Sequence, residues 1–167
     1  MVFFDTNIWI ELLAVSSPEK EHEIRQARAA SELLQKMKKK KEEIVTCKEQ
    51  LIELIHAVLK IQMRTFNRRQ KSAGEQGVGG IKEFRKSMEY QNSQLICSQV
   101  YGSMKALTIM DEKFSYSIEK ILTSIQLADI NDIMYFFYCQ ENNIRLYTFD
   151  GDMENLETDN TEIVEVI

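Results

Sequence analysis

The sequence has few of the features that mark secreted, membrane-spanning or thiolate-metal proteins. Its 167 residues include one proline and three scattered cysteines, and no Cys-x-x-Cys pair occurs. A disulfide framework or a zinc site is therefore not expected, and a reducing cytoplasm fits best. No apolar run approaches the ~20 residues of a membrane span. The predicted first strand begins at Val2, so we expect no targeting segment and no membrane partner.

The sequence also lacks an excess of positive charge: its net charge is −5, with 28% charged and 44% hydrophobic residues. This balance is ordinary for a globular protein, and it argues against a generally cationic nucleic-acid-binding protein. It leaves room for a local basic patch and for a cluster of acids that bind metal ions. The length favours one domain with a substantial core over residues 1–167.

Short apolar strands alternate with helices along the chain. The patterning predicts strands at about 2–4, 42–47, 145–149 and 162–167, and helices from Ile8, from Pro18 to Lys41, at 51–63, at 128–143, and two or three between 88 and 125. We expect a turn at residues 150–152. This alternation predicts an α/β fold with a short, mostly parallel sheet.

The segment from 64 to 86 differs in character, with four of the six glycines and many basic residues, and predicts a flexible or exposed connection. The basic side chains of this segment are candidates for binding a phosphate backbone. The alternative is that they simply face solvent on an exposed loop. Phe66 or Tyr90 is a candidate for stacking on an unpaired base. The candidate phosphate-binding residues, which contact the RNA substrate if the chain acts on one, are Arg64, Arg68, Arg69, Lys71, Lys82, Arg85 and Lys86.

Two carboxylates follow predicted strands directly. Asp5 ends the first strand and Asp150 ends the strand at 145–149, so a parallel sheet would deliver both to one edge. Taken alone, Asp5 is equally consistent with a helix cap, and the Thr148–Asp152 stretch with a turn. Asp152 is a further acid at the same place.

Two more acids lie on predicted helices. Glu53 shares a stripe with Glu49, His56 and Lys60, which taken alone is more often a solvated face. Asp132 stands at the start of a strongly apolar helix, where Asp129 and Asp132 could also form a capping pair. If these acids join Asp5 and Asp150, the cluster needs cations, and Mg²⁺ or Mn²⁺ is the natural partner.

The order of these pieces resembles that of PIN-domain nucleases. The similar stretches are FFDTNIWIELL, VTCKEQLIELIHAVL and NDIMYFFYCQENNIRLYTFDGDM, with the spacing from Asp132 to Asp150 the most specific part. The resemblance implies a three-layer α/β/α fold with a helical insertion at about 64–124. It also implies a Mg²⁺- or Mn²⁺-dependent endoribonuclease acting on single-stranded RNA, as in VapC-like toxins, whose partners are antitoxin proteins, and it suggests a homodimer.

Carried over residue by residue, the resemblance assigns the metal site to Asp5, Glu53, Asp132 and Asp150, with Asp152 as an extra acid. Asn7 and Thr148 would support the site through hydrogen bonds. Glu49 remains an alternative to Glu53, and Asp129 an alternative to Asp132. We prefer Glu53 because Leu54 follows it, and Asp132 because its spacing along the sequence to Asp150 matches the family. Such a site holds one or two ions: one activates a water molecule, and a second, where present, stabilises the departing 3′ oxygen.

Two other functions compete with this interpretation. The first is a catalytically inactive PIN-like module that binds RNA or protein, against which the presence of all four acids argues. The second is a phosphatase with Asp-x-Asp after its first strand, but Asp5 is followed by Thr6 and Asn7. The two histidines, His22 and His56, suggest no nucleophilic triad.

Overall fold

The computed structural model describes residues 1–13, 15, 20–157 and 163–167. These residues form one five-stranded sheet in the order β3-β2-β1-β4-β5, in which every neighbouring pair is parallel. The carboxyl ends of the strands therefore meet at one edge. The strands are β1 (Val2–Phe4), β2 (Ile44–Thr46), β3 (Ile109–Met110), β4 (Arg145–Thr148) and β5 (Val164–Val166).

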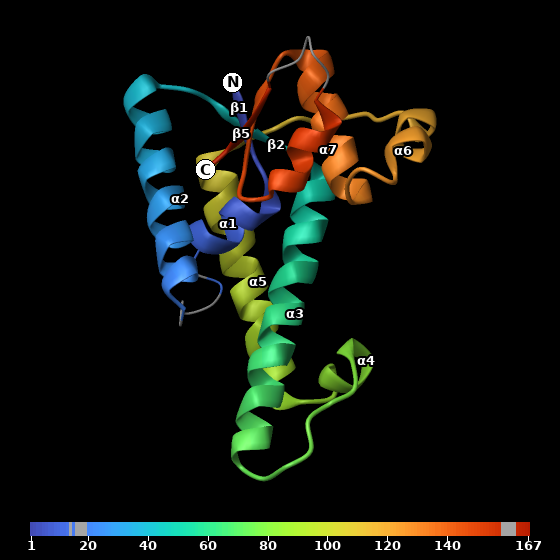
Figure 1. Ribbon diagram of the computed structural model, residues 1–167. Helices are drawn as coiled ribbons and strands as arrows, with labels where there is room; N and C mark the ends of the chain where they lie inside the picture. Colours follow the sequence, from blue (N-terminus) through green and yellow to red (C-terminus); the bar gives the residue numbers. More distant parts are fainter. Residues whose placement is uncertain (14, 16–19, 158–162) are drawn as a thin grey trace.

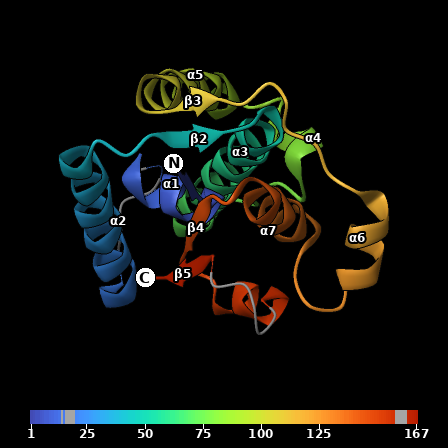
Figure 2. The same cartoon turned by 90° about the horizontal axis from the view of Figure 1, so that it is seen from above.

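Helices cover both faces of this sheet (Figures 1 and 2), which confirms the predicted three-layer α/β/α architecture. The helices are α1 (Thr6–Leu12), α2 (Glu21–Lys40), α3 (Lys48–Ser72), α4 (Ile81–Phe84), α5 (Met88–Leu107), α6 (Ile118–Ser124) and α7 (Ile130–Asn142), with the 3₁₀ helix η1 (Gly151–Leu156). Val2 and Phe4 pack on the side of α1, α2, α3 and α5, whereas Phe3, which points the other way, packs on the side of α6 and α7.

Helices α3 and α5 run together past the sheet and carry α4 near their far end (Figure 1). Ile61 and Ile96 lie where the two helices leave the main core, and we call residues 62–95, beyond them, the arm. Phe84 is fully buried there between Phe66 and Tyr90, at ring-centroid distances of 5.6 and 5.7 Å. The arm therefore has a small aromatic core of its own.

The structure corrects in part the prediction of a flexible or exposed connection over residues 64–86: most of these residues are exposed, but much of the segment is helical. Helix α3 continues to Ser72, and only residues 73–80 form a loop before α4. The Asn67 side chain exchanges two hydrogen bonds with the Val78 backbone, at 2.8 and 2.9 Å, which fastens this loop to α3. The glycines thus mark a short turn in an ordered hairpin.

Three smaller expectations change as well. The helix expected from Pro18 begins at Glu21, and Pro18 itself lies outside the described residues. The turn expected at 150–152 is the start of η1, with Asp150 as its N-cap. The two-residue strand β3 was not predicted, and it adds an edge to the sheet beside β2. Among the described residues, no helix is both long and apolar enough to cross a membrane.

Candidate active site

Asp5 lies at the carboxyl end of β1, in the middle of the sheet, and is 4% exposed. It is the N-cap of α1 and accepts a hydrogen bond from the Thr6 backbone N–H. Asp5 therefore caps a helix and also lies at the carboxyl edge of the sheet, so the two roles do not exclude each other. The cap fixes the carboxylate at the edge where the carboxyl ends of the strands meet.

The Thr148 hydroxyl joins the ends of β1 and β4. It donates to Asp5 Oδ2 at 2.7 Å, and it accepts from Asn7 Nδ2 and from the Asp150 backbone N–H, both at 2.9 Å. A hydroxyl has one proton and two lone pairs, so this one is fully used. Asn7 Oδ1 in turn accepts from the Phe149 N–H at 3.3 Å. This network holds Asp5 and the backbone of Asp150 on either side of one oxygen atom.

Glu53 reaches the same place from the first third of α3. Its Oε2 accepts hydrogen bonds from Thr6 Oγ1 at 2.8 Å and from the Tyr135 hydroxyl at 2.7 Å. These donors belong to α1 and α7, so Glu53 ties three helices together around Asp5. The alternative of a solvated stripe is thus wrong for Glu53, although His56 and Lys60 on that stripe are exposed.

Asp132 stands in the first turn of α7 and is half-buried. Burial, and after it the charges of Asp5, Glu53 and Asp150, together raise its pKa to about 8. Asp129 occupies the N-cap position without a side-chain capping bond, so the capping pair considered from the sequence is absent. Asp132 lines an open hollow of about 280 Å³ whose walls are residues 125–129 with Asp132, Asp150 and Asp152.

The pKa of Asp5 is raised as well, to about 6. Burial is the main cause, and the negative charges of Glu53 and Asp150 add to it, whereas the hydrogen bond from Thr148 works against the rise. The charges of four acids from distant parts of the chain, Asp5, Glu53, Asp132 and Asp150, therefore act on one another.

The two competing acids are placed differently. Glu49 lies near the Cys47 thiol, and no hydrogen bond between described residues joins it to Asp5 or Asp132. Asp129 is exposed at the rim of the hollow and is the weakest of the charges that act on Asp132. Asp152 is exposed at the rim too, with its backbone N–H bound to Asp150 Oδ1 at 2.9 Å.

The donor chemistry of this site fits a hard divalent cation. Carboxylate oxygens are the ligands that Mg²⁺ and Mn²⁺ prefer, and the negative charges of the neighbouring acids add to the effect of burial in raising the pKa of Asp5 and of Asp132. Among the described residues, no three Asp, Glu, His or Cys side chains are arranged to hold an ion unaided. Mg²⁺ typically binds through one or two carboxylates and keeps several of its waters, so such a ready-made group is not required.

Several residues that shape the site were missed by the sequence analysis. Thr6 and Tyr135 hold Glu53, and buried Gln50 donates to the Phe4 carbonyl at 2.6 Å, which fixes the end of β1. Asp111 follows β3 and accepts from the Tyr138 hydroxyl at 2.6 Å. Only the position of Asp111 directly after a short apolar run was a signal in the sequence.

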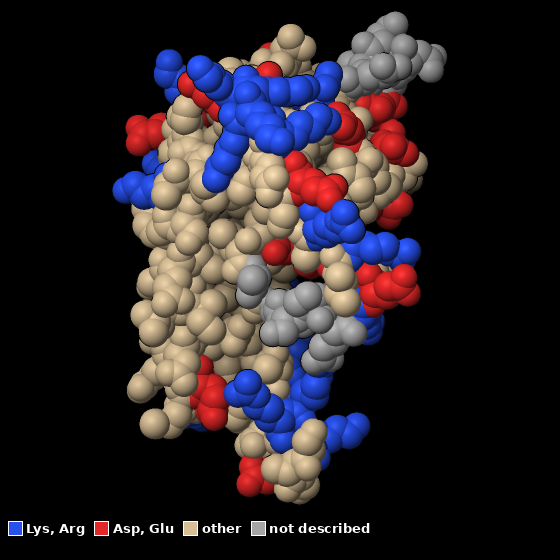
Figure 3. Space-filling view, turned by 90° about the vertical axis from the view of Figure 1, so that its left-hand side faces the viewer, with Lys and Arg blue, Asp and Glu red and all other residues tan. Residues whose placement is uncertain are grey.

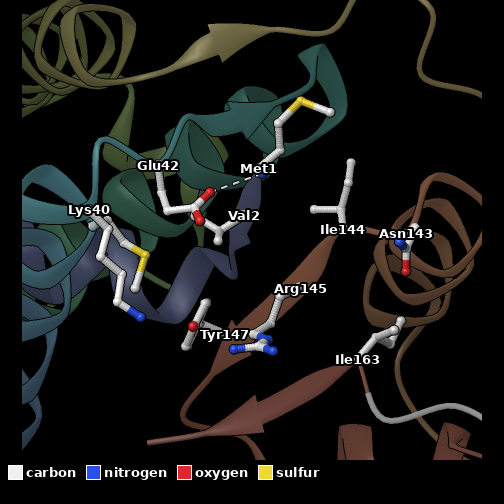
Figure 4. A pocket seen from close by; sticks show the side chains of 10 residues that line it. Met1, Val2, Lys40, Glu42, Asn143, Ile144, Arg145, Tyr147 and Ile163 are labelled. Atoms are coloured by element: carbon white, nitrogen blue, oxygen red, sulfur yellow. Dashed lines mark hydrogen bonds and ion pairs between the residues drawn. The ribbon is translucent and has the colours of Figure 1, made fainter.

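A second hollow, of about 300 Å³, lies at the opposite edge of the sheet (Figure 4). The Met1 amino group pairs with Glu42 at 3.1 Å beside it, and Arg145 pairs with Glu165 at 3.6 Å. These charged groups beside the hollow thus form ion pairs with one another. The hollow lies at the amino ends of β1 and β4. The acidic site at the carboxyl edge is therefore the better candidate for catalysis.

The candidate RNA-binding cations lie on the arm. Arg64, Arg68, Arg69 and Lys71 belong to α3, Lys82 belongs to α4, and Arg85 follows it, all with exposed side chains. Phe66 and Tyr90 are half-buried against Phe84, so packing accounts for part of each ring.

The comparisons with known proteins agree with this geometry. The model of the PIN domain family matches residues 2–158, which is nearly the whole chain. No curated protein and no solved structure matches it significantly. PIN domains are generally nucleases that use divalent metal ions. The extent of the match, together with the parallel sheet and the acids at its carboxyl edge, shows that the chain belongs to the PIN domain family.

Proposed function

We propose that the protein is a Mg²⁺- or Mn²⁺-dependent endoribonuclease that hydrolyses phosphodiester bonds in single-stranded RNA. The observation that carries this proposal is the convergence of Asp5, Glu53, Asp132 and Asp150 from β1, α3, α7 and the end of β4. Their mutual repulsion is relieved when a divalent cation binds. We assign the metal site to these four acids, with Asp152 at its rim.

The chain's own residues divide the work as follows. Asp5 and Asp150 offer carboxylate oxygens beside the shared Thr148 hydroxyl, and Asn7 and Thr148 keep them in place. Glu53 is oriented by Thr6 and Tyr135. Asp132 lines the hollow and has a pKa of about 8 in the metal-free protein, so it can hold a proton there until the cation binds. Bound Mg²⁺ or Mn²⁺ would activate water for attack on the phosphodiester and neutralise the charge that develops.

Incubation of the purified protein with unstructured RNA, in Mn²⁺ or in EDTA, tests this proposal. We expect cleavage that requires the metal, that is lost in Asp5→Asn, and that persists in the matched variant Glu49→Gln. RNA binding without cleavage in any condition would instead favour the inactive module. Cleavage by Asp5→Asn at the wild-type rate would rule out the assigned site.

Several finer expectations stay predictions. They are the toxin role, an antitoxin partner, a cytoplasmic location, a homodimer, and a single domain with an insertion at about 64–124. A small reading frame directly upstream that encodes a binding partner would support the toxin role. Sedimentation of the purified protein would settle the homodimer.

A further inference from the structure

One face of α3 connects the acidic site to the arm. An α-helix turns by about 100° per residue, so Lys60, Arg64 and Lys71 lie within about 20° of a line drawn along α3 through Glu53. All three side chains are exposed, and none forms an ion pair with a residue that the structure describes. We call Lys60, Arg64 and Lys71 the α3 stripe.

The opposite face of α3 has a different role. Leu54 and Val58 are buried in the core on that side, and Arg69 lines a groove with Phe84 between α3, α4 and α5. Packing therefore explains the inner face of the helix, but it does not explain the cations in line with Glu53.

The charge along this path is strongly one-sided. No Asp or Glu occurs between Glu53 and Glu75, and residues 60–86 contain eight lysines and arginines but only two glutamates. The whole chain has a net charge of −5, so this segment stands out against an acidic protein. In Figure 3, Lys and Arg lie at the lower end of the molecule, where the arm lies in Figure 1, and a larger group of them lies at the upper end. A local excess of this kind is what phosphate contacts require.

We infer that the α3 stripe binds the sugar-phosphate backbone on one side of the scissile bond, so that the RNA strand runs from the acidic site along the arm. This inference rests on the proposed function, because it takes the cleaved strand as its occupant. Glu53 and Lys71 are 18 residues apart, which is about 27 Å of helix at ~1.5 Å per residue. A stacked strand rises ~3.4 Å per nucleotide, so about eight nucleotides span this path.

The test measures RNA binding by fluorescence anisotropy in EDTA, with unstructured RNA of about 20 nucleotides and of about four. The stripe variant is Lys60→Gln/Arg64→Gln/Lys71→Gln. A matched variant, Lys38→Gln/Lys39→Gln/Lys40→Gln, removes the same charge from three exposed positions at the end of α2. Circular dichroism checks that each variant folds. Gln keeps a good helix propensity at all six sites.

We expect the stripe variant to bind the long RNA at least tenfold more weakly, with the matched variant within twofold of wild type. Each phosphate contact contributes ~0.7 to the slope of log K against log salt for single strands, so the slope should fall by about 2. Binding of the short RNA should change little, because it reaches few of the stripe cations. In Mn²⁺, the stripe variant should raise KM for the long RNA and leave kcat unchanged.

Equal losses in the two triple variants, or an unchanged salt slope, would overturn the inference and leave the proposed nuclease intact. Failure of the wild type to bind RNA at low salt would also overturn it, and would point to an acidic protein as the partner of the arm. Stripe-dependent RNA binding without any cleavage in Mn²⁺ would support the contact between RNA and the α3 stripe, while the proposed function, and with it the scissile bond beside the stripe, would fail.

Discussion

Replacing Thr148 with valine tests the hydrogen-bond network that holds the acids together. Valine keeps the size of threonine but removes the hydroxyl that donates to Asp5 and accepts from Asn7 and Asp150. A hydrogen bond to a charged group contributes ~1.5–3 kcal/mol, and a pKa change of one corresponds to ~1.36 kcal/mol. The pKa of Asp5, already raised to about 6, should therefore rise by a further ~1–2.

The stability lost in Thr148→Val should depend on pH, because the hydrogen bond from Thr148 stabilises the ionised form of Asp5. At pH 7 the wild-type Asp5 is largely ionised, whereas much of the Asp5 in Thr148→Val has taken up a proton, so the variant should lose about 1 kcal/mol of unfolding free energy there and about 2 kcal/mol above the raised pKa. At pH 5 the Asp5 carboxyl is largely protonated in both proteins, and the loss should be smaller.

Carbon-13 NMR titration of the carboxyl groups measures the Asp5 pKa, and urea unfolding at pH 5 and pH 7 measures stability. Thr123→Val is a matched control, since Thr123 is exposed on α6 and bonds only to nearby backbone carbonyls. An unchanged Asp5 pKa in Thr148→Val, with stability equal to that of the control, would refute the role assigned to this hydroxyl.

Three other outcomes follow from the same structure. Metal-free protein should lose stability as pH rises from about 4 to 8, because the folded-state pKa values of Asp5 (about 6) and Asp132 (about 8) exceed the ordinary value of 3.8. The urea midpoint measured across this pH range checks the loss, and Asp5→Asn should make the midpoint depend less on pH. Tyr135→Phe leaves Glu53 Oε2 with one donor and should cost ~1–3 kcal/mol in thermal unfolding, with a lower kcat and an unchanged KM for RNA. Phe84→Ala removes the aromatic core of the arm, a change that costs ~3–5 kcal/mol at buried sites, and hydrogen exchange should rise in the arm but not in the sheet.

The parts of the site that follow strands could be predicted from the sequence. Asp5 and Asp150 come directly after apolar runs, and a parallel sheet brings such ends together whatever the rest of the chain does. Glu53 and Asp132 needed the resemblance to the family, because helical periodicity alone favoured a solvated Glu53 and was equally consistent with a capping role for Asp132. In the structure, contacts with Thr6 and Tyr135 decide the matter for Glu53.

Features that depend on tertiary packing could not be predicted in this way. The arm was missed because the basic residues of α3 and the glycines at 74–80 lie in one polar stretch of sequence. Its structure depends on the burial of Phe84 and on the two hydrogen bonds between the Asn67 side chain and the Val78 backbone. Strand β3 has only two residues, which is too short for an alternating pattern. Tyr135 was hidden within an apolar helix, where its hydroxyl gave no sign of its partner.

The central claim is that acids from four distant segments form a single site for a divalent cation. Calorimetric titration of the metal-free protein with Mn²⁺ tests it without requiring activity. We expect saturable binding that is weakened more than about tenfold in Asp5→Asn and is largely kept in Glu49→Gln. Wild-type affinity in Asp5→Asn, or no saturable binding in the wild type, would contradict the account.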